Sequence, residues 1–356
     1  MTTATSWMTL LAIPMFYLAL IQFSFGQRAD LFQSDEILEI SLKGDARSLF
    51  SNTKGEPIYF DFLLYDKDTL GEKQEIPLRV RTRGHFRREM NICDYPPLLL
   101  NFAKETTENT IFEGQDKLKL VVPCRGEKYV AREFLVYKLY NLLTDKSFKV
   151  RLVRLTIEES SEKQIESDPL LCFLIEDEEA MAVRNQMVSI DRDLIQPQAI
   201  DQEDFHRVAV FQYLIGNTDW SIQYRQNIKL ISLPEFKIPI AVPYDFDHAG
   251  IVRAPYAKPA PELKLASITD RRYRGYCVED MQLFENTFSE FNAKKEEIYS
   301  LYTESKILDE KYIKSTIKFL EAFYYTINNT KRAKADFQYP CLPDGTGNVV
   351  IKGLKQ

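Results

Sequence analysis

Four side chains that carry oxygen donors stand in two short segments of the second half of the sequence. Asp219 and Asn227 lie in NTDWSIQYRQN, and Asp245 and Asp247 lie in PYDFDHAG. Two short apolar runs, joined by the turn SLPEF, separate the segments and predict a β-hairpin. Because a hairpin returns the chain to its starting end, the two segments should meet there. Three carboxylates and an amide oxygen are hard ligands that suit Mg²⁺ or Mn²⁺ rather than zinc.

Protein kinases use the same order of groups for phosphoryl transfer. One aspartate orients the acceptor hydroxyl, a later asparagine binds metal, and a further aspartate binds the metal that bridges the phosphates. A strand lysine and a helix glutamate complete that machinery. Here Lys119 lies in a predicted strand, and Glu133 lies near the start of the predicted helix that follows. The acidic pair Glu176 and Asp177 stands where a hinge between two lobes would be.

The first half of the chain reads mainly as strands. Residues 76–83 alternate with period two, with apolar side chains on one face and Arg79, Arg81 and Arg83 on the other. This arginine stripe is either a solvated face or a surface that binds anions. Further strands are predicted over 58–65, 117–122, 148–157 and 170–175, and a helix over 131–143.

From about residue 178 the pattern shifts toward helices. One helix is predicted over residues 203–215, and Gly216 suits its C-terminal cap. The hairpin strands are predicted over 227–231 and 238–242. Two amphipathic helices then close the chain.

Five stretches of the sequence resemble the CotH-type spore-coat kinases, in particular their secreted bacterial relatives. They are RTRGHFRR (81–88), LKLVVPC (118–124), EFLVYKLYNLL (133–143), NTDWSIQYRQNIKL (217–230) and VPYDFDHAG (242–250). The likeness extends more loosely to HipA-type atypical kinases. It implies Asp219 as the catalytic aspartate, with Asn227, Asp245 and Asp247 as metal ligands.

The resemblance also implies how the first half of the chain would bind ATP. Lys119 would contact the phosphates, and Glu133 would align Lys119. Arg81 and Arg83 would lie near phosphate or substrate, and Glu176 would lie at the hinge beside the nucleotide.

The expected fold is α+β, a two-lobed and atypical protein-kinase-like fold. A strand-rich N-lobe would cover residues 27–177, and a helical C-lobe with the metal and catalytic loops would cover 178–356. The expected activity is metal-dependent phosphoryl transfer from ATP to a hydroxyl, with Ser or Thr of a protein as the favoured acceptor. The identity of the acceptor protein stays open.

The amino-acid composition excludes several classes of protein and of functional site. Of 356 residues, 12% are aromatic, which permits a large core and excludes a mainly disordered chain. The net charge of −6 makes nucleic acid an unexpected partner. With three histidines and no zinc-type spacing, catalysis would rest on carboxylates. Five cysteines allow one or two disulfides and leave at least one cysteine outside them.

The first 26 residues predict export. They carry no charged side chain, the run from Trp7 to Phe25 is almost wholly apolar, and the small residues Ser24 and Gly26 suit cleavage before Gln27. We expect a signal peptide over residues 1–26 and a secreted, periplasmic or cell-envelope protein without a membrane span after cleavage. The alternative is an uncleaved N-terminal anchor, because the run is long enough to cross a bilayer.

Two other functions remain open from the sequence. ATP is scarce outside the cytoplasm and no glycine-rich loop precedes Lys119, which favours a non-catalytic envelope or surface binding module that reuses the fold. A metal-dependent phosphoesterase would need the same acidic residues but not Lys119.

Overall fold

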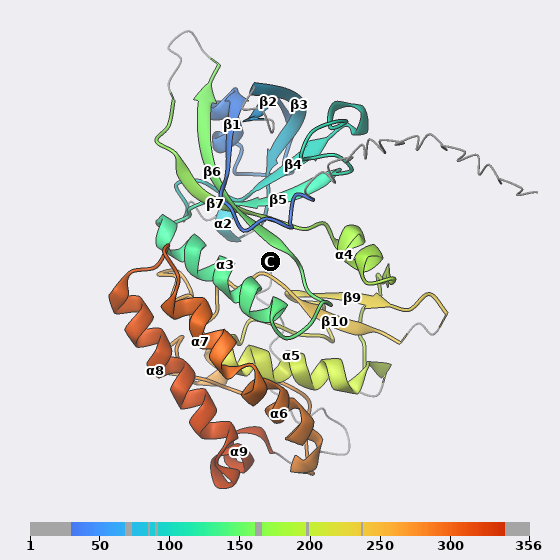
Figure 1. The fold of residues 1–356 in the computed structure, drawn as a ribbon, viewed down its shortest axis with the longest axis vertical. Coiled ribbons are helices and arrows are strands. Elements are labelled where there is room, and N and C mark those ends of the chain that lie inside the picture. The colour runs from blue at the N-terminus through green and yellow to red at the C-terminus, as the bar shows by residue number, and fades with distance from the viewer. Residues whose placement is uncertain are drawn as a thin grey trace, which may run out of the picture.

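The computed structural model describes residues 30–67, 73–84, 86–89, 92–160, 166–196, 199–235 and 238–338. Strands fill the first half of the chain and helices dominate the second, and Figure 1 shows the strand-rich part above the helix-rich part. The class is mixed α+β, as predicted. The signal peptide predicted over residues 1–26 lies outside the described residues. None of the described helices is long and apolar enough to cross a membrane.

Seven strands close into a barrel in the strand-rich part. They are β1 (Leu38–Gly44), β2 (Phe60–Lys67), β3 (Lys73–Thr82), β4 (Leu98–Phe102), β5 (Lys117–Val121), β6 (Val150–Glu159) and β7 (Leu170–Ile175). Their order around the barrel is β1-β2-β3-β4-β5-β7-β6. Neighbours pair antiparallel, except that β1 and β6 pair in parallel and close the barrel.

The alternation in β3 explains which side chains leave the barrel. Ile76 and Val80 point into it and are fully buried, whereas Arg81 is on the opposite face of the strand. Arg81 lies opposite Leu99 of β4, and Leu99 lies opposite Lys119 of β5. Residues that face each other across strands share one side of a sheet, so Arg81 and Lys119 are both on the outer surface of the barrel.

Two short helices, α1 (Ala46–Ser51) and α2 (Phe86–Glu89), connect strands of the barrel. The chain after α2 is fixed by a disulfide between Cys93 and Cys124, which agrees with the prediction of one or two disulfides. Cys172 is a buried free cysteine within the barrel.

Helix α3 (Glu127–Asn141) begins four residues before the predicted start. The earlier start is favoured because the carboxylate of Glu127 stands in the first turn, near the positive end of the helix dipole. It also accepts the backbone N–H of Leu171 of β7 at 2.8 Å. Ten residues of α3 are buried, and the helix packs against both β7 and α7 (Lys295–Thr303). Helix α3 therefore joins the barrel to the helices below it (Figure 1).

The helix-rich part contains a small sheet and six further helices among the described residues. The strands, in the order β10-β9-β8, are β8 (Val188–Ser189), β9 (Ile228–Ser232) and β10 (Ile240–Pro243). The other helices are α4 (Glu178–Arg184), α5 (Gln202–Ile215), α6 (Glu285–Ala293), α7, α8 (Glu310–Ile327) and α9 (Thr330–Phe337). Gly216 caps α5 in the left-handed conformation, with φ of 66°, as predicted. Four helices follow residue 284, where the sequence pattern predicted two.

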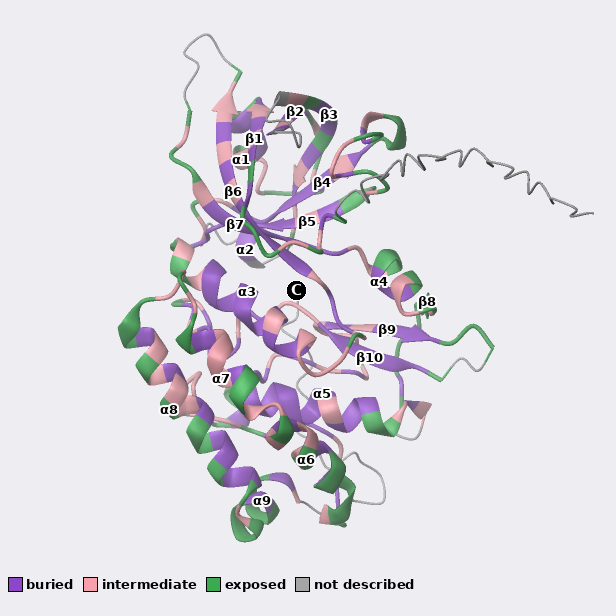
Figure 2. Ribbon diagram, in the orientation of Figure 1, coloured by how far each residue is buried: buried purple, intermediate pink, exposed green. Residues whose placement is uncertain are grey.

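Two hydrophobic cores follow from this arrangement (Figure 2). One fills the barrel with side chains from β1 to β7. The larger one collects α3, α5, the small sheet and the C-terminal helices. Helix α3 contributes to the larger core although it precedes residue 177. The boundary at residue 177 and the two-lobed, kinase-like arrangement stay predictions.

Candidate functional site

The β9–β10 hairpin brings the two predicted loops to one end of the small sheet. Ile228 lies opposite Pro243, so Asn227 and Tyr244 leave the hairpin side by side. The backbone N–H of Tyr244 donates to the Asn227 carbonyl at 3.1 Å. Asn227 and Asp245 both have left-handed backbone, with φ of 50° and 59°. Such conformations are costly for residues other than glycine and often occur at functional sites.

Asp219 and Asn227 are in direct contact. The Asn227 side-chain amide donates to the Asp219 carbonyl at 2.7 Å and to the Asp219 carboxylate at 3.0 Å. The Gln226 amide donates to the other carboxylate oxygen of Asp219. The amide nitrogen of Asn227 is used in these bonds, and its oxygen is the atom that suits a metal ion.

Asp245 and Asp247 are held by a residue that the sequence analysis did not assign to the site. The Arg87 guanidinium lies 3.3 Å from Asp245 Oδ1 and 3.4 Å from Asp247 Oδ2. The hydroxyl of Tyr256 donates to Asp247 Oδ2 at 3.1 Å. The two carboxylates also lie within hydrogen-bonding reach of each other.

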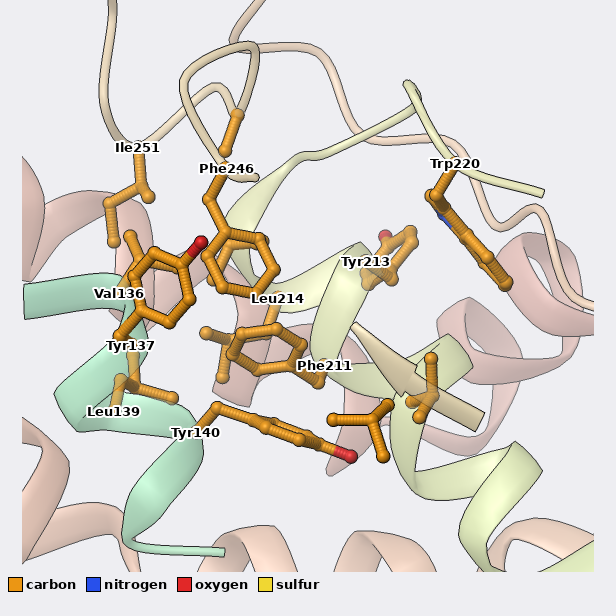
Figure 3. Close-up of a cluster of buried hydrophobic side chains, with 14 of the residues drawn as sticks. Val136, Tyr137, Leu139, Tyr140, Phe211, Tyr213, Leu214, Trp220, Phe246 and Ile251 are labelled. Carbon is orange, nitrogen blue, oxygen red and sulfur yellow. The ribbon is translucent and has the colours of Figure 1, made fainter. Parts of the chain in front are cut away.

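Phe246 anchors the loop that carries these two aspartates. Its fully buried ring packs edge-on against Tyr137 of α3, at 4.7 Å between ring centroids, and against Phe211 of α5, at 5.5 Å. Figure 3 shows the three rings in one cluster beneath the loop. The Asp245 backbone N–H also donates to the Tyr137 hydroxyl at 2.8 Å. Helices α3 and α5 therefore fix the positions of Asp245 and Asp247.

Glu133 of α3 faces the same cluster. Its side chain is 3% exposed, and Oε1 has no hydrogen-bond partner among the described residues. Burial raises the pKa of Glu133 well above its usual value, and the positive charge of Arg87 acts in the opposite direction. The cation beside Glu133 is therefore Arg87, and the expected ion pair between Glu133 and Lys119 is not formed in the described part of the chain.

Lys119 lies instead near two other cations, Arg83 and Lys229. Its ammonium is 4.9 Å from the centroid of the Tyr244 ring. The pKa of Lys119 is lowered to about 8, mainly by burial and also by the nearby charges of Arg83 and Lys229, while Asp245 acts in the opposite direction. Arg83 and Lys119 thus face the hairpin end together, which suits an anionic ligand.

Two predicted residues lie apart from this group. Arg81 extends over the ring of Tyr59, 5.2 Å from its centroid, on the outside of the barrel. Glu176 is buried and its carboxylate receives two bonds of 2.8 Å from Arg184 of α4. It also accepts the Lys149 backbone N–H at 2.9 Å. The side chain of Glu176 therefore ties the end of β7 to α4.

The charges of the three aspartates affect one another's pKa values. Burial raises the pKa of Asp219, and the charges of Asp245 and Asp247 contribute to the shift. Burial and the neighbouring charge of Asp247 raise the pKa of Asp245. The pKa of Asp247 is lowered although burial opposes this, because Arg87 and His248 stabilise its charged form. The charges of Asp219, Asp245 and Asp247 thus act on one another across the end of the hairpin.

The oxygen atoms of this site are of the kind that binds a hard divalent cation. Asp245 and Asp247 supply adjacent carboxylates, and Asn227 supplies an amide oxygen at the same end of the hairpin. In the conformation described, Arg87 pairs with both carboxylates. Among the described residues, no group of three or more His, Cys, Asp or Glu side chains could hold a metal ion.

Arg87 is the site residue that sequence reasoning missed. It lies in the stretch RTRGHFRR, whose two adjacent arginines at 87 and 88 were the available signal. The spacing alone could not show that one of them reaches loop 244–248, because that contact joins residues 158 positions apart.

The chain is similar to the Helicobacter pylori proinflammatory kinase CtkA, with 11% sequence identity and a TM-score of 0.38. The match covers 67% of this chain and 91% of the CtkA chain. No protein-family model matches the sequence, and no curated protein matches it. That neighbour is a kinase.

Proposed function

We propose that this chain is an exported, CotH-like atypical kinase that transfers a phosphoryl group from ATP to a hydroxyl, with Ser or Thr of a protein as the acceptor. One observation carries the proposal. The β9–β10 hairpin brings Asp219, Asn227 and Asp245 to one end of the small sheet, opposite the cations Lys119 and Arg83 of the barrel. An anionic nucleotide between these groups would meet positive charge on one side and metal-binding oxygens on the other.

Each residue has a role in this proposal. Lys119 and Arg83 would bind the phosphates as cations. Asp219, held in place by the amides of Gln226 and Asn227, would orient the acceptor hydroxyl and accept its proton. Asn227, Asp245 and Asp247 would hold Mg²⁺ or Mn²⁺, which would neutralise phosphate charge when bound.

The disulfide between Cys93 and Cys124 supports export, because disulfides persist in oxidising compartments. We propose that residues 1–26 direct the chain out of the cytoplasm and are removed there. N-terminal sequencing of the protein from the producing cell would reveal a start at Gln27. An intact start at Met1 would favour the uncleaved anchor instead.

The proposed function is tested with the isosteric variants Asp219→Asn and Asp245→Asn and with labelled ATP, Mn²⁺ and a general acceptor protein. We expect Asp219→Asn to reduce labelling by about 10²- to 10⁴-fold while nucleotide binding is retained, since it removes only the group that orients the hydroxyl. Asp245→Asn should weaken Mn²⁺-dependent nucleotide binding as well. The control is Asp61→Asn, an exposed residue of β2, which should label like wild type.

Labelling by both variants at the wild-type rate would refute the assigned roles. The rival function is a non-catalytic binding module, and the pairing of Arg87 with Asp245 and Asp247 specifically favours it. In that case neither ATP nor any other nucleotide would raise the melting temperature in the presence of Mn²⁺.

A further inference from the structure

Arg87 and Arg88 are adjacent in the sequence, but their side chains contact different parts of the molecule. The Arg88 guanidinium donates to the backbone carbonyls of Asn52, Lys54 and Gly55 at 3.2, 3.2 and 2.7 Å. These bonds attach α2 to the barrel. The Arg87 side chain, only 9% exposed, meets the carboxylates of loop 244–248 instead. A change in the position of the Arg87 side chain therefore does not require α2 to leave the barrel.

The contacts of Arg87 are long: its guanidinium donates one hydrogen bond, to Asp245 Oδ1, and forms an ion pair with Asp247 Oδ2. Its distances to Asp245 and Asp247 are 3.3 and 3.4 Å. Tight charge-assisted bonds between a guanidinium and a carboxylate are shorter, at about 2.7–2.9 Å. One guanidinium thus spans two carboxylates without an optimal bond to either.

Three carboxyl groups surround the Arg87 guanidinium in this cluster. They belong to Glu133, Asp245 and Asp247, and Glu133 Oε1 has no hydrogen-bond partner among the residues described. Buried charges are costly unless they are paired and hydrogen-bonded. A cation of higher charge would satisfy the cluster better than one guanidinium does.

The space beside Glu133 and Asp247 does not hold a hydrated cation while Arg87 is in place. The pocket between α3 and loop 244–248 is lined by Arg87, Val121, Val122, Glu133, Asp247 and Tyr256. Its free space is about 10 Å³, about enough for one water molecule. Mg²⁺ usually keeps several of its own waters when it binds a protein. Because Arg87 also pairs with one oxygen of each aspartate, a divalent cation has to compete with it for these carboxylates.

We propose that Arg87 is an internal competitor of the divalent cation: it pairs with Asp245 and Asp247 in a resting state, and the metal binds only when its side chain withdraws. The inference rests on the proposed function in taking Asp245 and Asp247 as cation ligands. Its consequence is that the apparent metal affinity of the wild-type protein is reduced by the fraction of molecules in which Arg87 occupies the site.

The test measures Mn²⁺ binding to the whole chain by titration calorimetry and by the electron paramagnetic resonance signal of free Mn²⁺, without nucleotide or acceptor. We expect Arg87→Gln to bind Mn²⁺ at least about tenfold more tightly than wild type, because the competing charge is removed. The control Arg79→Gln removes an exposed arginine of β3 that bonds to Asn101, and should bind Mn²⁺ like wild type. This control separates a local effect from the change in net charge.

Arg87→Lys keeps the test decisive if the Gln variant does not fold. Lysine keeps the charge but presents it at one point, so it pairs less well with two carboxylates at once. It should bind Mn²⁺ more tightly than wild type and less tightly than Arg87→Gln. Unchanged or weaker Mn²⁺ binding by a folded Arg87 variant overturns the inference, as does absence of Mn²⁺ binding in all four proteins. Tighter Mn²⁺ binding by Arg87→Gln without any phosphoryl transfer refutes the proposed function alone.

Discussion

The barrel interior and the loop after β10 bury their side chains in contrasting ways. Inside the barrel, buried Leu64, Leu100 and Leu118 contact other apolar side chains, and their burial directly stabilises the fold. The loop buries Asp247 and places the carboxylate of Asp245 beside it, with left-handed backbone at Asp245. Burying charge in this way contributes little to stability and is expected where a protein binds or transforms a ligand.

The difference teaches where to look for function in this chain. A region whose side chains satisfy one another completely needs no partner. In the loop region, three carboxyl groups surround one guanidinium, and one oxygen of Glu133 has no hydrogen-bond partner among the described residues. A ligand that supplies positive charge or a hydrogen-bond donor would stabilise these groups. Mutations should therefore affect folding in the barrel and binding in the loop, and three predictions test this separation.

The largest effect on stability is expected from Leu100→Ala in β4. The side chain is fully buried in the barrel, so truncation leaves a cavity and should lower the free energy of unfolding by about 3 kcal/mol. Denaturant unfolding measures this, and the nucleotide affinity of the folded fraction should stay within twofold of wild type. Leu283→Ala, at a residue 54% exposed, is the control and should cost less than about 0.5 kcal/mol. A loss of nucleotide affinity in Leu100→Ala would break the separation of the two regions.

An intermediate effect is expected from the protonation of Lys119. Its pKa of about 8 means that the side chain loses its charge as the pH rises from 7 to 9, and phosphate binding should weaken about tenfold over that range. Titration of nucleotide binding at several pH values measures this. Lys119→Arg keeps its charge and should show a flat profile, whereas the exposed Lys117→Arg should keep the wild-type profile. An identical slope in Lys119→Arg would mean that another group controls the pH dependence.

The smallest effect is expected from Glu133→Gln. The folded state raises the pKa of Glu133, so it binds the proton more tightly than the unfolded chain does, and this contribution to stability is present at low pH and lost as the pH rises. At pH 8 the free energy of unfolding of the variant should therefore equal that of wild type or exceed it by about 1 kcal/mol. Its dependence on pH should be flatter than that of wild type between pH 5 and 8. Thermal unfolding across that range checks this. Glu39→Gln, on an exposed position of β1, is the control. A large loss of stability in Glu133→Gln would show that the carboxylate acts as a structural group, like the side chains of the barrel.

Local patterns predicted the elements well. The period-two alternation of β3, the cap of α5 at Gly216 and the β9–β10 hairpin depend on nearby residues, and the structure has all three. The order of the segments around the hairpin also predicted that Asn227 and the chain before Asp245 would be neighbours. The two extra C-terminal helices were missed because short turns between helices leave little signal in an amphipathic pattern.

The pairing of charges across the chain could not be predicted in the same way. Sequence order suggested Lys119 as the partner of Glu133, but Lys119 extends from the outer face of β5 toward Tyr244, and Glu133 faces Arg87. Glu176 likewise pairs with Arg184 rather than with a group of the site. Which cation reaches which carboxylate depends on how α2, α3 and loop 244–248 pack against one another.

The sequence by itself determined the mixed α+β class, the individual strands and helices, and the acidic residues at the ends of one hairpin. These features follow from residue periodicity and turn chemistry, which act over a few positions along the chain. Only the tertiary structure decided that Arg87 would lie between Asp245 and Asp247 and that α3 would join the larger core. The reason is physical: electrostatic pairing and core packing depend on distance in space, and distant segments become neighbours only when the barrel closes and the helices pack beneath it.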